Sequence, residues 1–271
     1  MRVTSSCLAK GFWARSADEF RRLAHIAVSM EGIKGASGPR ELFSFHDQAA
    51  MQDVGSFSDA DIGGYSKAHL DWIAPSSPAL DAQARSKPSF YNPNGHVRFH
   101  GAISTRLPEN KPQIERSGYA AWRTKDRPFT IFGRSLWDLD PYVFLALRFK
   151  SDGRSYHVNI QTESLVESDI HQHRLFSKRP GEWETALIRL NDFVRTNHGF
   201  VVEPQTEMLR QKIRTVGVGL TDRIQGPFDL SIERIWATNN PREADFVDAE
   251  IQLPNASQLK SKDGKGIKWS N

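Results

Sequence analysis

The stretch FLALRFKSDGRSYHVNI, residues 144–160, decides the fold class of this chain. Apolar and polar side chains alternate on both sides of the turn Ser151-Asp152-Gly153. The apolar positions are Val143, Leu145, Leu147, Phe149, Tyr156, Val158 and Ile160, and the polar ones are Arg148, Lys150, His157, Asn159 and Gln161. A period of two is typical of a strand with one buried face, and Asp-Gly supplies the positive φ of a tight turn. The stretch therefore predicts a β-hairpin.

A second stretch, VGVGLTDRIQGPFDLSIERI at residues 216–235, repeats this pattern. Its apolar positions are Val216, Val218, Leu220, Phe228, Leu230 and Ile232, with Gly217 and Gly219 between the first three and Gly226-Pro227 before Phe228. The glycines resemble part of a dinucleotide-binding fingerprint, but that motif needs a helix after them, and here a turn and a strand follow. We expect no cofactor here. The small residues instead let a neighbouring sheet or loop approach the strand.

Length and composition indicate one globular domain. The chain has 271 residues, of which 38% are hydrophobic and 25% charged, and its 16 Phe and 7 Trp can build a sizeable core. Its 36 basic and 32 acidic residues leave a net charge of +4 without a basic block, which is weak support for an anionic partner. The single Cys7 excludes an internal disulfide framework and fits a reducing compartment. No apolar run approaches the ~20 residues of a membrane span.

The N-terminal segment, residues 1–39, differs from the rest. Its basic and hydroxyl-bearing start resembles a mitochondrial presequence, although Asp18 and Glu19 are atypical of one. Ser16-x-x-Glu19 predicts a capping box that opens a short helix. The apolar side of this helix would carry Phe20, Leu23, Ala24, Ala27 and Val28. A targeting segment and a surface helix docked on the domain are equal alternatives, and both hold if cleavage falls upstream of Ser16.

The folded domain is expected at residues 40–240, followed by a polar tail at 241–271. Strands are predicted near 41–46, 65–73, 96–105, 118–124, 142–150, 154–162, 183–190, 214–221 and 227–237. Nine strands with few helical patterns favour an antiparallel two-sheet sandwich of the jelly-roll type. Residues 74–94 carry four prolines and several serines, so we expect a long loop there. Leu147, Phe149, Val158, Phe228 and Ile232 are predicted core residues.

The sequence carries only weak motifs for catalysis or for metal, sugar or nucleic-acid binding. The pair His171-x-His173 is expected in a solvent-exposed loop rather than at a metal, because no third ligand stands nearby. No GxSxG elbow is present, and no aromatic-basic strand suggests nucleic-acid binding. The acids that a glycosidase would need, and the tryptophans that a sugar-stacking platform would need, are assigned structural roles by default. These residues are Asp138, Asp140, Glu163, Glu167, Asp169, Trp72, Trp122, Trp137, Trp183 and Trp236.

Six short motifs, in order over residues 42–240, resemble the complex I intermediate-associated protein family. They are Asp61-Ile-Gly63-Gly64-Tyr-Ser, Phe99-His-Gly101-Ala-Ile-Ser, Arg116-Ser-Gly118-Tyr, the hairpin Asp152-Gly153-Arg-x-Tyr156, Trp183 with Leu190-x-x-Phe193, and Ile213-x-x-Val-Gly217-Val with Gly226-Pro227-Phe228-x-Leu. We expect the glycines and aromatic residues of these motifs to be structural. The resemblance implies an all-β, galactose-binding-like jelly-roll sandwich, which agrees with the strand pattern.

The same resemblance implies a non-enzymatic assembly factor of mitochondrial complex I. Such a protein would bind membrane-arm intermediates and other assembly factors at the matrix side of the inner membrane, and would be absent from the finished enzyme. It implies no cofactor, metal or catalytic residue. Arg154 and Trp137 are our candidate partner contacts, together with the loops after Asp152-Gly153 and at 74–94. The alternative is a carbohydrate-binding module, which would usually carry a secretion signal that the N-terminus lacks.

Overall fold

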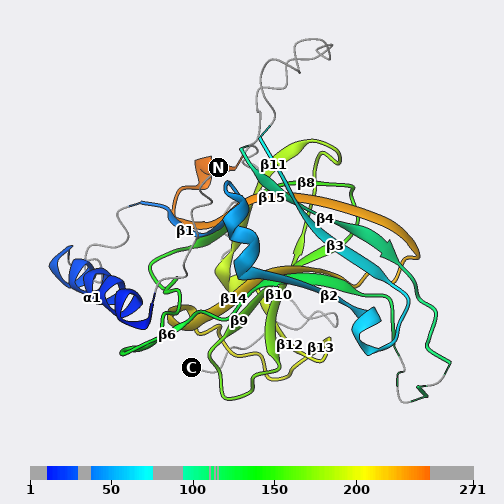
Figure 1. Cartoon of the computed structure of the whole chain (residues 1–271), viewed down its shortest axis with the longest axis horizontal. Helices are drawn as coiled ribbons and strands as arrows, with labels where there is room; N and C mark the ends of the chain where they lie inside the picture. Colours follow the sequence, from blue (N-terminus) through cyan, green and yellow to red (C-terminus); the bar gives the residue numbers. More distant parts are fainter. Residues whose placement is uncertain are drawn as a thin grey trace, which may run out of the picture.

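The computed structural model describes residues 11–29, 38–75, 94–109, 111, 112, 114 and 116–244. Two antiparallel sheets face each other across one core, and one α-helix, α1 (Phe12–Ser29), lies at the end of this sandwich (Figure 1). Cys7, most of the proline-rich loop 74–94 and the tail beyond residue 244 lie outside the described residues. In the part of the chain that the structure covers, no helix is long and apolar enough to cross a membrane.

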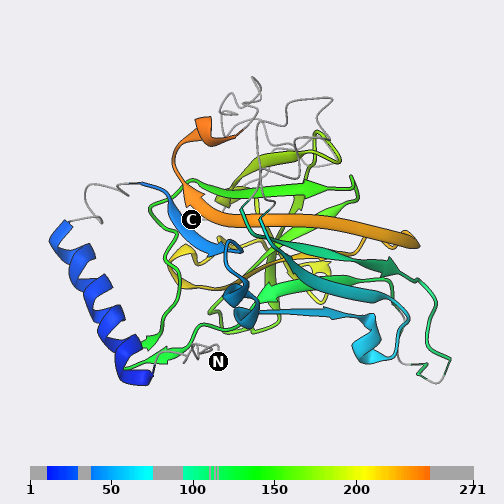
Figure 2. The ribbon, with the colours of Figure 1, turned by 45° about the horizontal axis from the view of Figure 1, so that its top comes forward.

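The first sheet has six strands. Its order is β11-β8-β15-β4-β3, and β1 pairs with the second half of β15. The strands are β1 (Arg40–Ser44), β3 (Lys67–Ile73), β4 (His96–Ile103), β8 (Phe144–Ser151), β11 (Trp183–Arg189) and β15 (Gly226–Thr238). The long strand β15, orange in Figure 2, pairs with β4, β8 and β1 in turn and so joins the parts of this sheet.

The second sheet has seven strands in the order β13-β12-β10-β9-β14-β5-β2. They are β2 (Val54–Ser58), β5 (Ala120–Thr124), β9 (Tyr156–Thr162), β10 (Asp169–Leu175), β12 (Val194–Asn197), β13 (Phe200–Val201) and β14 (Ile213–Leu220). A separate small hairpin joins β6 (Phe129–Thr130) to β7 (Gly133–Arg134). Short 3-10 helices occupy η1 (Gln48–Asp53), η2 (Asp59–Ile62), η4 (Leu190–Asp192), η5 (Arg210–Lys212) and η6 (Pro241–Glu243).

The core lies between the two sheets and is lined by the alternating apolar positions of their strands. Leu147, Phe149, Val158, Phe228 and Ile232, the predicted core residues, are all at most 2% exposed. Rings pack across the interior, as where Phe45 meets Trp122 at a centroid distance of 5.4 Å. The predicted β-sandwich class is therefore confirmed.

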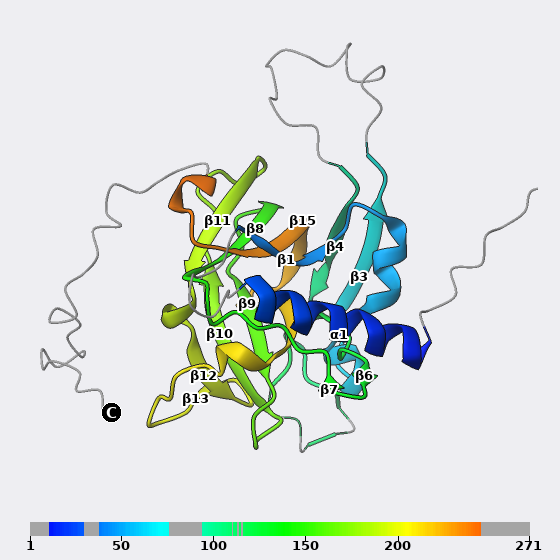
Figure 3. The same ribbon diagram turned by 90° about the vertical axis from the view of Figure 1, so that its left-hand side faces the viewer.

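Four details differ from the sequence expectations. Val143 was expected on the apolar face of this strand, but it precedes β8 and is 50% exposed. Leu145, two residues later, is buried. The strands β2, β6, β7, β10, β12 and β13 were not expected. The predicted capping box at Ser16 is wrong, because α1 begins at Phe12 and the Ser16 hydroxyl donates to the Phe12 carbonyl within the helix. The helix packs on the domain, as the surface-helix alternative predicts, since Phe20 stacks on Phe132 of the β6–β7 hairpin (Figure 3).

The histidine pair is the fourth detail. His171 and His173 belong to β10 rather than to an exposed loop, and they stand opposite Ile160 and Val158 of β9. Residues directly opposite each other on paired strands share a face, so both imidazoles point toward the interior of the sandwich. His171 is 4% exposed. The described residues contain no cluster of three metal-ligating side chains.

Candidate functional site

A groove of about 350 Å³ crosses the outer face of the seven-stranded sheet. Its lining comes from strands β2, β5, β9, β10 and β14, from the loop before β10 and from the turn between β12 and β13. The lining residues are Phe57, Trp122, Arg123, Asn159, Gln161, Glu167, Ser168, Ile170, His198, Gly199, Thr215 and Gly217. A groove across strands presents side chains that the sheet itself holds in register.

The floor of the groove is formed where three strands come close together. Gly217 of β14 pairs with Asn159 of β9 on one side and with Arg123 of β5 on the other. A Cβ atom at Gly217 would lie 2.2 Å from the Trp122 carbonyl oxygen, so no larger residue fits without a backbone shift. The close approach at this glycine comes from the adjacent strand β5 of the same sheet, and not from another sheet or a loop as expected. It leaves a low floor between the polar side chains of the neighbouring strands.

Hydrogen bonds link the polar side chains on this floor. Arg123 Nη1 donates to Gln161 Oε1 at 2.9 Å, and the same oxygen accepts from Thr215 Oγ1 at 3.3 Å. Gln172 Nε2 donates to Asn159 Oδ1 at 2.9 Å. Side-chain amides each carry two donors and two acceptor lone pairs, so these groups keep hydrogen-bonding capacity for a ligand.

The sheet curves so that both of its edges border the groove. Phe57 lies on the edge strand β2, while His198 and Gly199 form the turn beside the opposite edge strand β13. Phe200 of β13 lies 4.4 Å below the guanidinium of Arg116, which is close in sequence to β5 near the other edge. Phe57 and Phe200 are 40% and 57% exposed. Of these two rings, that of Phe57 lines the groove beside the polar floor.

Charges around the groove are balanced. Arg214 Nη2 lies 2.6 Å from Asp126 Oδ2, and Arg214 Nη1 lies 3.6 Å from Glu167 Oε1. Arg123 stands 3.9 Å from the same Asp126. The hydrogen bond from Arg214 is the largest cause that lowers the pKa of Asp126, so this carboxylate stays ionised at neutral pH. Such a surrounding suits a neutral, hydrogen-bonding ligand better than a strongly charged one.

The acids considered for glycosidase chemistry are engaged individually. Asp169 accepts from Asn197 at 2.7 Å, Asp140 lies 3.9 Å from Arg210, and Glu163 lies 4.0 Å from Arg134. The tryptophans do not form a platform in the groove, because Trp122, Trp137 and Trp236 are at most 4% exposed. This agrees with the expectation that most of them are core residues.

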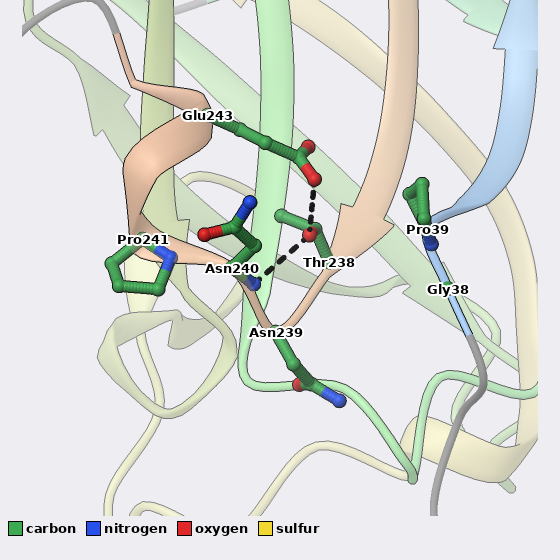
Figure 4. Close-up of a pocket in the computed structure, with 7 residues that line it drawn as sticks. All are labelled: Gly38, Pro39, Thr238, Asn239, Asn240, Pro241 and Glu243. Carbon is green, nitrogen blue, oxygen red and sulfur yellow. Dashed lines mark hydrogen bonds between the residues drawn. The ribbon is translucent and has the colours of Figure 1, made fainter.

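A second hollow, of about 430 Å³, lies where β15 ends (Figure 4). Glu243 accepts hydrogen bonds there from the Thr238 hydroxyl at 2.9 Å and from the Trp236 indole at 2.5 Å. The Asn240 amide donates to the Thr238 hydroxyl at 3.1 Å. These polar groups satisfy one another and hold η6 over the end of β15, so we assign this hollow a structural role.

Arg154 anchors the turn between β14 and β15. Its guanidinium donates to both carboxylate oxygens of Asp222, at 2.9 and 2.7 Å, and to the carbonyl oxygens of Gly226, Pro227 and Ile224. Its side chain is 13% exposed and that of Asp222 is 5% exposed. The predicted contact residue is therefore largely enclosed, and its bonds account for its place in the hairpin motif.

Trp137, the other predicted contact residue, lies in the core. Its backbone exchanges two hydrogen bonds with Ile213, each of 3.0 Å, and its ring packs under the Arg127 guanidinium at 4.7 Å. The side chain is 4% exposed, so this fold does not present it to a partner. The proline-rich loop that was also expected to supply contacts lies outside the described residues.

Several family-motif residues surround a buried carboxylate, Asp59. It accepts from the Ser66 amide at 2.8 Å, from the Ser66 hydroxyl at 2.9 Å and from the Gly118 amide at 2.5 Å. Gly64 packs against it so closely that a Cβ would lie 2.5 Å from the carboxylate carbon. Gly63 ends η2 in the left-handed region, with φ of 106°. These four residues and Asp59 join the ends of β2, β3 and β5.

The remaining motif residues also have structural surroundings. A Cβ at Gly101 would lie 1.9 Å from the Lys67 carbonyl oxygen, and Trp183 packs edge-on against His96. Phe228 packs against Phe99 at a centroid distance of 4.9 Å. Tyr156 is fully buried, and its burial raises the pKa of its hydroxyl. Asp152 Oδ1 accepts from the Arg154 amide at 3.0 Å and Gly153 adopts φ of 91°, as expected of turn formers.

Sequence reasoning did not identify the groove or Asp59. Arg123, Asn159 and Gln161 were visible only as polar positions between core residues, and nothing in one strand says which strands flank it. Asp59 stands two residues before Asp61 of the Asp61-Ile-Gly-Gly motif. Its place between the small residues Ser58 and Ala60 was the available signal.

Comparisons with known proteins converge on one family. The family model "Complex I intermediate-associated protein 30 (CIA30)" matches residues 43–232. The Neurospora crassa protein "Complex I intermediate-associated protein 30, mitochondrial" is 53% identical over 272 residues, covering 99% of this chain and 97% of that relative. The mouse protein of the same name is 27% identical over 180 residues, covering 65% of this chain and 54% of the mouse protein. The chain thus spans about half of the mouse relative's length.

The fold also resembles a solved structure. A family 11 carbohydrate-binding module of a Clostridium thermocellum cellulosomal cellulase superposes with a TM-score of 0.50 at 14% identity, covering 76% of this chain and 96% of the module. At this identity the likeness concerns the sandwich architecture alone.

Proposed function

This chain belongs to the complex I intermediate-associated protein 30 family, and from that premise we propose that it acts as an assembly factor of mitochondrial respiratory complex I. The 53% identity to the Neurospora crassa relative over nearly the full length of both chains supports the proposal. The role is binding rather than catalysis. In it, the protein associates with an incomplete complex and is absent from the finished enzyme.

The finer proposal concerns place and partner. The protein binds membrane-arm subunits of complex I intermediates, together with other assembly factors, from the matrix side of the inner membrane. Support comes from the names of the relatives, which include the words "complex I intermediate-associated" and "mitochondrial". A factor that must later leave needs a modest contact surface with few strong anchors.

We place the partner contact in the sheet groove. The observation that carries this choice is a hydrogen-bonding floor, centred on Arg123 and Gln161, beside the exposed ring of Phe57. Interfaces commonly combine aromatic residues and arginine with satisfied polar groups. The amide-bearing floor matches the donors and acceptors of an extended polypeptide segment, and the balanced charges favour a segment without net charge.

The test compares two arginines with equal exposure. The protein is tagged in its own cells, mitochondria are solubilised gently, and co-migrating subunits are identified on a native gel. Arg123→Ala combined with Phe57→Ala should reduce recovery of the complex I intermediate several-fold. Arg98→Ala on the other sheet is the matched control for the arginine change, because Arg98 and Arg123 side chains are each 47% exposed.

Two results would contradict the proposal. Unchanged recovery with the groove variant would show that the groove is not the contact, and co-migration with the finished enzyme would argue against an assembly role. The alternative of a carbohydrate-binding module predicts that the wild-type protein binds soluble oligosaccharides and that Arg123→Ala abolishes this binding. A glycan array with both proteins separates the two functions.

A further inference from the structure

The helix α1 is attached to the domain by polar side chains. Ser16 and Glu19 are 3% and 8% exposed, and both face the β6–β7 hairpin. Ser16 Oγ accepts from the Ile131 amide at 3.2 Å, and Glu19 Oε2 accepts from the Ser135 hydroxyl at 2.9 Å. A helix on the surface of a soluble domain usually buries its apolar stripe instead. This helix therefore has an apolar stripe still available.

That stripe faces outward. Trp13, Phe20 and Val28 are 76%, 61% and 85% exposed. At 100° per residue they fall within one arc of the helix, beside the docked side that carries Ser16 and Glu19. Three exposed large apolar side chains on one arc are more than scattered surface hydrophobics account for.

The hairpin beneath the helix continues the apolar surface. Phe129, Ile131 and Phe132 are 56%, 56% and 50% exposed, and Phe132 stacks on Phe20 with ring centroids 6.4 Å apart. Figure 2 shows the β6–β7 hairpin beside the N-terminal end of α1, so the hairpin and this end of the helix lie side by side. We call their apolar surface the apolar cap; it consists of Trp13, Phe20, Val28, Phe129, Ile131 and Phe132.

The same two segments carry a surplus of positive charge. Residues 12–29 and 125–135 contain six Arg and Lys against three Asp and Glu, a surplus of three. Arg21 borders the apolar arc with a side chain that is 77% exposed, and its 3.1 Å pair with Asp18 is a weak surface pair. The Arg134 guanidinium lies 4.2 Å over the Phe129 ring, but its side chain is 23% exposed and stands 3.8 Å from Asp126 and 4.0 Å from Glu163. Arg21 is therefore the well-exposed cation beside the apolar cap.

We propose that the apolar cap docks on the surface of a lipid bilayer with anionic headgroups. Helices that lie in the membrane interface combine an aromatic and aliphatic face with flanking basic residues, and Trp is enriched at this depth. Arg21 then meets the headgroup phosphates while Trp13 and Phe20 enter the boundary with the acyl chains. The inference deepens the proposed location beside a membrane. It rests on the proposed function only for the identity of that membrane.

The experiment is co-flotation of the full chain with vesicles. Vesicles of phosphatidylcholine mixed with phosphatidylglycerol in equal parts should bind the protein, and vesicles of phosphatidylcholine alone should bind it about tenfold more weakly. Added salt should weaken binding, because headgroup attraction is screened. Trp13→Ser combined with Phe20→Ser should reduce binding to the mixed vesicles by about tenfold or more, because both side chains lose their contact with the acyl chains.

A matched control and a second variant keep the test decisive. Phe176→Ser removes a ring that is 59% exposed, close to the 61% of Phe20, at a distant site and should bind like wild type. If the serine variant loses α1 by circular dichroism, Arg21→Glu replaces it and should weaken the preference for phosphatidylglycerol.

Three results would overturn the inference. They are vesicle binding that survives both cap variants, an equal loss with Phe176→Ser, or absence of vesicle binding by a wild-type protein whose complex I capture depends on Trp13 and Phe20. In the last case the cap is a protein contact. Groove variants such as Arg123→Ala should float like wild type. The vesicle experiment therefore tests the apolar cap even if the proposed function fails.

Discussion

Asp59 shows how a single buried carboxylate can determine a family motif. Its three acceptor bonds come from Ser66 and Gly118, two residues far apart in the sequence. Removal of such an acceptor leaves the donors unpaired in a water-free site, which costs more than the net value of the bonds. The neighbouring glycines, Gly63 and Gly64, provide the room and the left-handed turn that let the chain pass around it.

We expect Asp59→Ala to lower the free energy of unfolding by about 3 kcal/mol, because two backbone donors and one hydroxyl lose their acceptor. Asp61→Ala is the control. It removes the single hydrogen bond that the Ser58 amide donates to Asp61, and should lower the free energy of unfolding by about 1 kcal/mol or less. Urea unfolding followed by tryptophan fluorescence measures both. Equal losses in the two variants would contradict the role assigned to Asp59.

We expect Arg154→Ala to cost about 3 kcal/mol of folding free energy, since it leaves the Asp222 carboxylate enclosed without its partner. Arg154→Lys should recover only part of this folding free energy, because an ammonium cannot bind both carboxylate oxygens in parallel. A double-mutant cycle with Asp222→Ala, measured by urea unfolding, gives the interaction energy between Arg154 and Asp222. Should both single variants unfold like wild type, the anchoring role is wrong. A loss of complex I capture by Arg154→Ala would then need a different explanation from turn disruption.

At the scale of elements, alternation alone identified most of the long strands. The hairpin around Asp152-Gly153 and the strand Ile213–Leu220 were predictable because one face of each is apolar at every second position. The strand β10 was missed since its inward face carries His171 and His173, which read as polar in sequence. The start of α1 was misplaced because Ser16 looks like a cap but donates backward to Phe12 in mid-helix.

Two glycines of the seven-stranded sheet provide a matched test of close strand approach. Gly217→Ala places a methyl group 2.2 Å from the Trp122 carbonyl oxygen and should destabilise the protein by about 2 kcal/mol. Gly55→Ala in β2 meets nothing within 4 Å and should be neutral or stabilise by about 0.5 kcal/mol. Thermal unfolding of both variants checks the contrast. If Gly55→Ala were the more damaging change, the geometry of the groove floor would be wrong.

For the whole molecule, the sequence indicated the sandwich and the family, both of which are confirmed, but not the groove. A jelly-roll brings together strands that are distant in the chain, so Arg123, Asn159 and Thr215 become neighbours only after folding. The cationic and apolar side chains of residues 12–29 and 125–135 likewise become neighbours only when these two segments pack together.

Stability should fall when the pH is lowered through the histidine range. Burial is the largest cause that lowers the pKa of His96, His157, His171 and His173. The unfolded chain then binds protons more readily than the folded one, starting near its ordinary value of about 6.5. The stabilisation is complete above that pH and is lost as the pH falls from there through the lower folded values.

Urea unfolding at constant ionic strength, from about pH 7.5 down to about pH 5.5, measures this loss; in this range ordinary carboxylates remain ionised. His171→Gln should flatten the dependence on pH, because it removes one buried titrating group. A free energy of unfolding that stays constant or rises on acidification would refute the assignment.

The strand pairings of β15 determine the order in which the six-stranded sheet can form. Without residues 226–238, the described strands of this sheet form only the pairs β3 with β4 and β8 with β11, while β1 has no strand to pair with. A chain that emerges from its N-terminus must therefore hold two separate ribbons and a lone strand until almost its last strand arrives. Such long-range closure makes folding slow and leaves strand edges open in the meantime. The chain itself would therefore need its open strand edges shielded until β15 is in place.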